Sequence, residues 1–433
     1  MELTGLSFDN YKAFAQRETL ELRPLTVLIG RNSSGKSAIA RLPLLLARAL
    51  SERAQSPVDL DIDGVDFGGS FVDLIHKRRP HGSIGLGATF ENDQGEHYDV
   101  WARVQHFSEF EMQVVSAFEL RQAGRPSLAF TWVLEDDPRV EPGRYKAQVG
   151  GGPPFEVALS FQGLWPTIEV NGTIDAAVVH LAVLLKHALD ALRPALAPLG
   201  YLGPFRTPPQ RQYRFPGGMP QSVGVSGAEA PALLGADLLR KGGMVVRAVG
   251  DWYRQNLGGW ILDVSRQQGA SFSLVLRSPD NPTVEVNLAD VGTGLSQVLP
   301  LVVQRHFDAL VGKSLGVEVV EQPELHLHPG AHGDLADLYI QAARQPRSRF
   351  IVETHSENFI LRLRRRIAEG LLAPGRVALY WVDDAPRPGS QLKRISLSPS
   401  GEVSMWPKGV FSEDFEEVRA IRAAQRSEPH EEA

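Results

Sequence analysis

Residues 30–37, GRNSSGKS, constrain the fold of this chain more than any other segment. They match the pattern G-x-x-x-x-G-K-[ST] without a gap, between an apolar run, LTVLI, and a stretch of helical character, AIARLPLLLARALSE. In such a strand–loop–helix unit, the backbone N–H groups of the loop point at phosphate oxygens at the helix N-terminus. An ordinary Gly/Ser-rich turn would not require these two flanking elements, so we predict a phosphate-binding loop.

The residue types in this loop suit that chemistry. Lys36 would place a positive charge on the β and γ phosphates, and Ser37 would offer its hydroxyl to Mg²⁺. Glycines let the backbone curl closely around the ligand. Pro43 lies in the helical stretch that follows, and we expect a kink or an early end there. The predicted phosphate-binding residues are Gly30, Asn32, Ser33, Ser34, Gly35, Lys36 and Ser37.

Composition excludes several classes of protein. The 433 residues are 43% apolar and 22% charged, which is ordinary globular usage. The net charge of −6 argues against a protein held on nucleic acid by its overall field. The absence of Cys excludes disulfides, thiolate metal sites and Cys nucleophiles. The N-terminus has no signal-peptide pattern, and the apolar stretch near 175–198 carries charged residues, so we expect a soluble, cytoplasmic protein without a membrane span.

The pattern of apolar and polar residues changes along the chain. From about 82 to 170, short alternating runs separated by Gly, Pro and Asp turns predict an antiparallel, β-rich section, and a long helix over roughly 174–197 follows. The fold class predicted is α/β, with one core built from both chain ends. The predicted domains are 1–75 and 285–400 for this core, 76–200 for a β-rich insertion that ends in the long helix, 201–284 for a loop and helical lobe, and 401–433 for a C-terminal tail element.

Five segments follow the order found in one known group of proteins. FDNYKAF, the phosphate loop, DVGTGLSQ, VVEQPELHLHP and VETHSEN resemble the ABC-type ATPase heads of the SMC/RecF/OLD-nuclease group. Within it, the chain most resembles stand-alone bacterial AAA-family ATPases with a small C-terminal domain of unknown function, whose signature is similar to MWPKGVFSEDFEE at 405–417. Nothing resembles the acidic toprim cluster of OLD-type nucleases. The resemblance implies an ABC/SMC-type P-loop ATPase head that binds ATP and Mg²⁺.

The resemblance also implies a homodimer formed around nucleotide. In such heads, a signature segment from a second copy caps the ATP bound by the first. We define residues 292–297, GTGLSQ, as the signature segment of this chain. Its glycines would allow close backbone approach, and the helix N-terminus behind them would point donors at the γ-phosphate. The residues expected to contact nucleotide are Gly292, Gly294, Ser296 and Gln297. Read alone, the segment is equally typical of a loop-to-helix junction.

The strand end at 321–324 raises the question of hydrolysis. Glu321 matches the acid that holds Mg²⁺ through water, with Ser37 as the other metal contact. Gln322 stands where a glutamate general base is expected, and an amide can orient water but cannot accept its proton. We therefore expect slow hydrolysis with Glu324 as the candidate base, whereas a capping or salt-bridging Glu324 is the alternative. Glu318, an acid inside the apolar run, is either exposed at the strand's start or paired with a buried basic residue.

Two further residues acquire a role only through the resemblance. His355 matches a switch histidine that senses the γ-phosphate, and Lys12 matches a basic residue that faces nucleotide. A structural histidine and a solvated lysine are the respective alternatives. His326 and His328 could share one face of a strand, but the sequence offers no third ligand cluster for Zn²⁺.

Basic residues gather at 77–79, in the loop 200–218 with Arg206, Arg211 and Arg214, and at 362–366. Arg-rich helix faces are usually only solvated, although each cluster could also contact a phosphate backbone. DNA is therefore one candidate partner. We expect a slow ATPase switch that dimerises around nucleotide and controls a separate effector or DNA-processing partner, in a setting such as anti-phage defence. A non-hydrolysing nucleotide-gated scaffold and a RecF-like DNA-repair ATPase are the alternatives.

Overall fold

A six-stranded sheet forms the centre of the computed structural model, which describes residues 1–92, 94–134, 137–140, 142–169, 175–196, 199–281, 283–311, 316–384, 389–406 and 417–422. Its strand order is β13–β18–β19–β3–β20–β21, and all neighbours are parallel except β20 and β21. The strands are β3 (Leu25–Gly30), β13 (Gly200–Leu202), β18 (Val317–Glu321), β19 (Arg349–Glu353), β20 (Val377–Asp383) and β21 (Gln391–Ile395).

Both faces of this central sheet are covered. Every residue of β3 and β18 is buried, which explains why these strands read as continuous apolar runs and not as alternating ones. Leu28 packs into one hydrophobic cluster, with the N-terminal strands and the insertion. Val27 and Ile29 pack into the other cluster, with the later helices.

The strand β19 lies between the phosphate-loop strand β3 and β18. The register pairs Glu353 with Glu321 on one side and with Leu28 on the other. Parallel strands bring their carboxyl ends to one edge of the sheet. The phosphate loop and the segments that follow Glu321 and Glu353 therefore start from the same edge.

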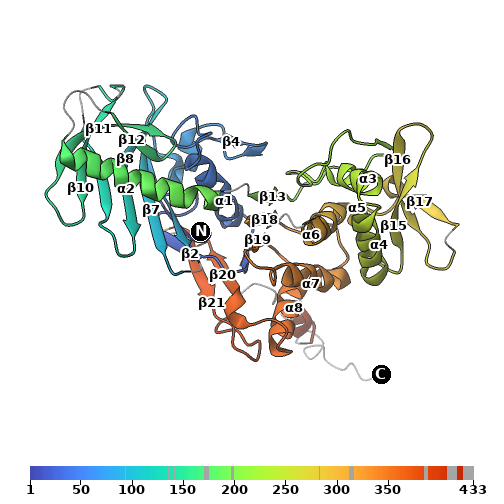
Figure 1. The fold of residues 1–433 in the computed structure, drawn as a ribbon. Coiled ribbons are helices and arrows are strands. Elements are labelled where there is room, and N and C mark those ends of the chain that lie inside the picture. The colour runs from blue at the N-terminus through green and yellow to red at the C-terminus, as the bar shows by residue number, and fades with distance from the viewer. Residues whose placement is uncertain are drawn as a thin grey trace, which may run out of the picture.

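A nine-stranded antiparallel sheet holds the β-rich section, as the alternating sequence predicts. Its order is β12–β11–β10–β9–β8–β7–β6–β1–β2, so the first two strands of the chain extend it. Helix α2 (Ala176–Leu192) lies across this sheet (Figure 1), and its buried residues Leu181, Leu185 and Leu192 join the same hydrophobic cluster as the sheet. The strands are β1 (Glu2–Asp9), β2 (Glu18–Glu21), β6 (Ser83–Glu91), β7 (His97–Phe107), β8 (Met112–Gln122), β9 (Leu128–Trp132), β10 (Gly143–Val149), β11 (Phe155–Gln162) and β12 (Trp165–Glu169).

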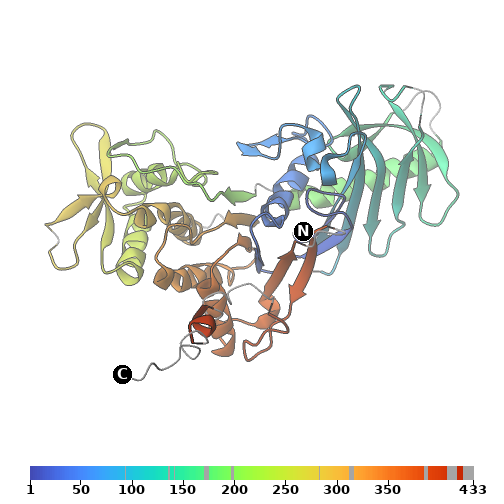
Figure 2. The same ribbon diagram turned by 180° about the vertical axis from the view of Figure 1, so that it is seen from behind.

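A helical lobe with a small antiparallel sheet lies at the opposite end of the molecule, as both views show (Figures 1 and 2). Helices α3, α4 and α7 contact α6, and α7 contacts α8. The lobe and the helices near it comprise α3 (Ala230–Arg240), α4 (Met244–Asn256), α5 (Thr293–Gln297), α6 (Leu299–Val311), α7 (His332–Ala342) and α8 (Glu357–Ala368), with strands β14 (Tyr213–Arg214), β15 (Ile261–Arg266), β16 (Ser271–Arg277) and β17 (Glu285–Asn287).

Helix α1 (Lys36–Ala49) joins the two large sheets. It contacts β3, β18 and β19 of the central sheet and β6 of the nine-stranded sheet. The helix runs through Pro43 to Ala49, so the early end that the proline allowed does not occur. A hairpin of β4 (Asp61–Ile62) and β5 (Val65–Asp66) follows, and short 3-10 helices lie at Phe71–Leu74, His76–Arg78, Arg193–Leu196, Leu288–Asp290, Pro329–Ala331 and Pro374–Arg376.

The domain boundaries given above stay a prediction, and most of the tail element, including residues 407–416 and 423–433, lies outside the described residues. Among the residues that the structure describes, no helix combines the length and the apolar character needed to cross a membrane.

The acid inside the buried strand β18 has a buried basic partner. Glu318 is 3% exposed and forms an ion pair with Arg305 of α6. Arg305 also donates to Asp308 at 2.7 Å, and its guanidinium lies 4.7 Å from the ring centre of Phe350. Of the two explanations for Glu318, the buried basic partner is confirmed.

We expect Arg305→Met to lower the free energy of unfolding by about 3–5 kcal/mol, because Glu318 and Asp308 would stay buried without their cation. Urea unfolding followed by circular dichroism measures the change. Arg254→Met is the matched control: Arg254 forms an exposed pair with Asp251, and its loss should cost less than about 1 kcal/mol. Equal effects of the two substitutions would contradict a structural role for the buried cluster.

Candidate functional site

The phosphate loop turns through two left-handed residues. Ser33 has φ 63° and Gly35 has φ 103°, a region that glycine adopts without steric cost. A Cβ at Gly35 would come within 2.9 Å of the Phe14 ring, and one at Gly30 within 2.7 Å of the Val382 carbonyl oxygen. Phe14, the last residue of the FDNYKAF segment, thus packs directly against the loop. Neither glycine of the motif leaves room for a side chain.

Lys36 is folded back onto its own loop. Its Nζ donates to the carbonyl oxygens of Gly30 at 3.0 Å and Arg31 at 2.6 Å. The side chain is 3% exposed, and burial lowers its pKa, opposed by the acids Glu353 and Asp384. The hydroxyl of Ser34 is buried without a hydrogen-bond partner, whereas Asn32 and Ser33 are exposed at the tip of the loop. A phosphate oxygen fits this loop, because it would give the Ser34 hydroxyl an acceptor.

The carboxylate of Glu321 is fully engaged within the protein. Arg41 of α1 donates from Nε to Oε1 at 2.5 Å and from Nη2 to Oε2 at 2.8 Å, and the Tyr201 hydroxyl donates to Oε1 at 3.0 Å. Glu321 is 2% exposed. A bidentate guanidinium–carboxylate pair of this kind is among the strongest hydrogen-bonded arrangements in proteins. Sequence reasoning selected Glu321 but missed both of its partners.

The neighbouring strand end carries a second acid, which sequence reasoning did not select. Glu353 closes the apolar run FIVE in the same way as Glu321 closes VEVVE, and this repetition was the available signal. Its Oε2 is buried and has no hydrogen-bond partner among the described residues. Burial and the charge of Glu321 raise the pKa of Glu353 to about 7, although Ser37, Lys36 and Arg41 lower it.

Gln322 adopts a strained backbone conformation, with φ 44°. Its N–H donates to the Glu353 carbonyl oxygen at 2.7 Å, and its own carbonyl oxygen accepts from Arg206 Nη2 at 3.0 Å. Left-handed conformations of non-glycine residues persist where surrounding contacts enforce them, often at functional sites. Here these contacts fix the chain direction just after the strand end.

Glu324 and His355 meet directly. The Oε1 atom of Glu324 accepts the backbone N–H of His355 at 2.7 Å, while Oε2 is buried without a hydrogen-bond partner. Burial raises the pKa of Glu324. Partial desolvation and the nearby Lys36 ammonium lower the pKa of His355 to about 4, so its imidazole is neutral at pH 7. The structure thus brings both predicted residues to the edge that carries the phosphate loop.

The signature segment has an exposed start and a buried end. Gly292 and Thr293 are exposed, whereas Ser296 and Gln297 are buried. The Ser296 hydroxyl donates to the Thr293 carbonyl oxygen at 2.9 Å, within its own helix. The exposed face of the segment therefore consists of its first residues.

Arg206 links the signature segment to the strand end. Gln297 donates to the Arg206 carbonyl oxygen at 3.1 Å, and the Arg206 guanidinium donates to the carbonyl oxygens of Glu321 and Gln322. Arg206 is 5% exposed, so it belongs to the interior and not to a basic surface. Its neighbour Phe205 is exposed.

The remaining candidate residues are Lys12, His326 and His328. Lys12 donates from Nζ to the Phe67 carbonyl oxygen at 2.5 Å, and burial lowers its pKa. His326 and His328 are exposed, and His328 Nδ1 caps the following turn by accepting from Gly330. Within the described ranges, no cluster of three or more His, Cys, Asp or Glu residues could hold a metal ion.

Several arginines of the basic clusters form ion pairs with neighbouring acids. Arg362 and Arg366 on α8 pair with Asp337, and Arg365 pairs with Glu369. In the 200–218 loop, Arg211 pairs with Asp290. These pairings reduce the positive charge that a phosphate backbone would meet at either cluster.

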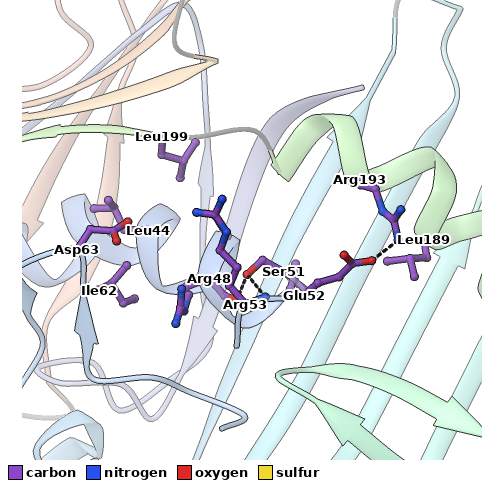
Figure 3. Close-up of a pocket in the computed structure, with 12 residues that line it drawn as sticks. Leu44, Arg48, Ser51, Glu52, Arg53, Ile62, Asp63, Leu189, Arg193 and Leu199 are labelled. Carbon is purple, nitrogen blue, oxygen red and sulfur yellow. Dashed lines mark hydrogen bonds and ion pairs between the residues drawn. The ribbon is translucent and has the colours of Figure 1, made fainter. Parts of the chain in front are cut away.

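A pocket of about 350 Å³ opens at the far end of α1 from the phosphate loop (Figure 3). Leu44 and Arg48 of α1, Ile62 of the β4–β5 hairpin and Leu189 of α2 line it. An ion pair between Glu52 and Arg193 joins the end of α1 to the end of α2 at its rim. The pocket is therefore shared by the core helix and the insertion.

We expect Gly294→Ala to destabilise the protein by about 1–3 kcal/mol, because the added Cβ would overlap the carbonyl oxygen of His326. The control is Gly292→Ala, whose Cβ would meet nothing within 4 Å and should change stability by less than about 0.5 kcal/mol. Denaturant unfolding of both variants tests this packing. If both substitutions were equally harmless, the signature segment would not lie against the strand-end loop.

One family model covers part of this site. The family model "AAA ATPase domain" matches residues 262–360, which include the signature segment, Glu321 and His355. A comparison with curated proteins gives no match. Similar solved structures include an SMC head domain from Thermotoga maritima (12% identity, TM-score 0.42, 92% of this chain and 100% of that chain).

Two further similar structures are SMC heads in complexes. One is an SMC head bound to the C-terminal winged-helix domain of ScpA (14% identity, TM-score 0.49, 92% and 99% of the two chains). The other is an SMC head with an extended coiled coil bound to the C-terminal domain of ScpA, from Pyrococcus furiosus (11% identity, TM-score 0.43, 97% and 99%).

Residues 262–360 are thus similar to an ATPase domain of the AAA type, and the chain as a whole has an α/β fold with a phosphate loop. The expected small C-terminal domain and the expected absence of a toprim nuclease stay predictions.

Proposed function

We propose that this chain binds ATP–Mg²⁺, dimerises head to tail around two nucleotides and hydrolyses them slowly as a switch for a separate effector. The observation that carries the proposal is the meeting of four parts at one sheet edge: the phosphate loop, the acids ending β18 and β19, the Gln322–Glu324 turn and His355. A cytoplasmic setting such as anti-phage defence, and a DNA-processing partner, belong to the same proposal.

Nucleotide binding is supported by the phosphate loop. Lys36 already makes hydrogen bonds to backbone carbonyl oxygens, and the phosphates would offer it charged acceptors in their place. The buried hydroxyl of Ser34 would gain a partner. Gly30, Asn32, Ser33 and Gly35 would line the phosphates with backbone N–H groups, and Ser37 would contact Mg²⁺, which supplies charge neutralisation when bound. Lys12 would be a basic residue that faces the nucleotide; in this structure its Nζ donates to the Phe67 carbonyl oxygen.

Dimerisation is supported by the exposed start of the signature segment. Gly292 and Thr293 are free to approach a second molecule, and the backbone N–H groups at the start of α5 would face the γ-phosphate bound there. Gly294 packs against the strand-end loop, Gln297 donates to the Arg206 carbonyl oxygen, and Ser296 donates to the Thr293 carbonyl oxygen. These contacts would hold the exposed residues in place.

Slow hydrolysis is supported by the chemistry of the turn after β18. The Gln322 amide would orient the attacking water without accepting its proton. The second oxygen of Glu324 is free to accept that proton, and His355 would sense the γ-phosphate as a neutral donor. Turnover would be slow because the expected carboxylate is missing at position 322, which suits a long-lived ATP-bound dimer.

A second candidate function is a non-hydrolysing nucleotide-gated scaffold. One oxygen of Glu324 is already committed to the His355 N–H, which favours a structural role for this acid. In that case, nucleotide binding and dimerisation would persist, while phosphate release would equal the uncatalysed background.

We expect ATP to convert the monomer to a dimer, and we expect Thr293→Arg to block this conversion by adding bulk and charge at the exposed start of the signature segment. Light scattering with and without ATP measures the mass. Lys36→Ala should remove the response to ATP by deleting the charge that meets the phosphates. Gln94→Arg, at an exposed position in the insertion, is the control that should dimerise normally. A mass that ATP does not change in the wild type would refute the capping model.

We expect Glu324→Gln to reduce steady-state phosphate release by about 10²–10⁴-fold, the effect typical of a lost general base. Gln322→Glu should raise it, because a carboxylate would then face the attacking water. Nucleotide affinity should barely change in either variant, since neither side chain is expected to contact the phosphates in the ground state. Background rates in the wild type and both variants would favour the scaffold instead.

A further inference from the structure

Glu321 and Glu353 end two neighbouring strands at the sheet edge that carries the phosphate loop, and their hydrogen bonding differs. The family resemblance assigns the metal to Glu321. We propose instead that Glu353 is the protein carboxylate that holds Mg²⁺ beside Ser37, while Glu321 serves as the anchor for Arg41. This inference rests on the proposed binding of ATP–Mg²⁺ and identifies which residue of that site meets the metal.

Strand order brings Glu353 closer to the loop. β19 is the immediate neighbour of β3, whereas β18 is one strand further away. Neighbouring strands lie about 4.8 Å apart, so the backbone of Glu321 is about twice as far from the loop strand as that of Glu353. Ser37 is accordingly close enough to be one of the groups that lower the pKa of Glu353.

The hydrogen bonding of the two acids points the same way. Glu321 receives three donors, two from the guanidinium of Arg41 and one from Tyr201. A cation would have to displace a positively charged partner to bind there. The Oε2 atom of Glu353 is buried without a hydrogen-bond partner, and Glu353 forms no ion pair within the described part of the chain. Mg²⁺ typically binds one or two carboxylates together with phosphates and water, and this free oxygen matches that need.

The Arg41–Glu321 pair has its own function in this arrangement. It ties the first half of α1 to the end of β18 across the end of β19. Arg41 neutralises Glu321, whereas no guanidinium pairs with Glu353 within the described residues. The pair therefore holds the loop helix against the end of β18 without contacting the metal.

The test compares Glu353→Gln with Glu321→Gln, two isosteric changes one strand apart. Mn²⁺ replaces Mg²⁺ as the probe, and its binding to the complex with a non-hydrolysable ATP analogue is followed by electron paramagnetic resonance. We expect Glu353→Gln to weaken Mn²⁺ binding by about 10–100-fold and Glu321→Gln to weaken it much less. Binding of the analogue in EDTA should be similar in the wild type and in Glu353→Gln, because only the metal-dependent part of affinity is lost.

The outcomes separate the two hypotheses. A larger metal defect in Glu321→Gln, equal defects in both variants, or none in either would overturn the assignment of Glu353. Failure of the wild type to bind the analogue at all would overturn the proposed function as well. Thermal unfolding checks that each variant is folded. If Glu353→Gln is not folded, Glu353→Asp keeps the charge but withdraws it by one methylene; it should also weaken Mn²⁺ binding, and wild-type affinity in it would refute the proposal.

Discussion

The parallel pairing of β19 with both β3 and β18 is the constraint on which the site depends. It fixes the register in which Glu353 stands beside Glu321 and in which the phosphate loop begins one strand away. Because every residue of β3 and β18 is buried, a slip by one residue would turn the apolar side chains of a strand onto the wrong face. The register is therefore set by the two hydrophobic cores, and the polar residues at the strand ends take their positions from it.

Helix α1 extends this constraint to the rest of the molecule. Its first residues belong to the phosphate loop, Arg41 binds the end of β18, and its last turns line the pocket shared with the insertion. The nine-stranded sheet packs on the same helix. Helix α1, which has buried contacts along its length, thus joins the insertion to the sheet edge that carries the phosphate loop. Because protein interiors are close-packed, a displacement of one end of α1 should also shift the residues that pack against the helix.

The sequence predicts those parts of the fold and site that are encoded locally. The gapless phosphate loop, the alternating strands of the β-rich section and the apolar strand ending in Glu321 can each be recognised from a short window. Contacts between distant segments could not be recognised in this way. Arg41 and Glu321 are 280 residues apart, and Tyr201 is 120 residues from Glu321, so no spacing in the sequence connects them. Glu353 was overlooked because its position beside Ser37 follows from strand order, which motif reading does not provide.

The folded-back conformation of Lys36 influences whether the phosphate loop prefers charged or uncharged ligands. Before any ligand arrives, the ammonium group already has two carbonyl acceptors, so binding is an exchange of acceptors and not the filling of a vacancy. A neutral ligand oxygen would only replace one such bond by another of similar strength. A charged phosphate oxygen adds the attraction between two full charges and can draw Lys36 out of the loop. We therefore expect the loop to prefer charged ligands, although its backbone N–H groups could serve either kind.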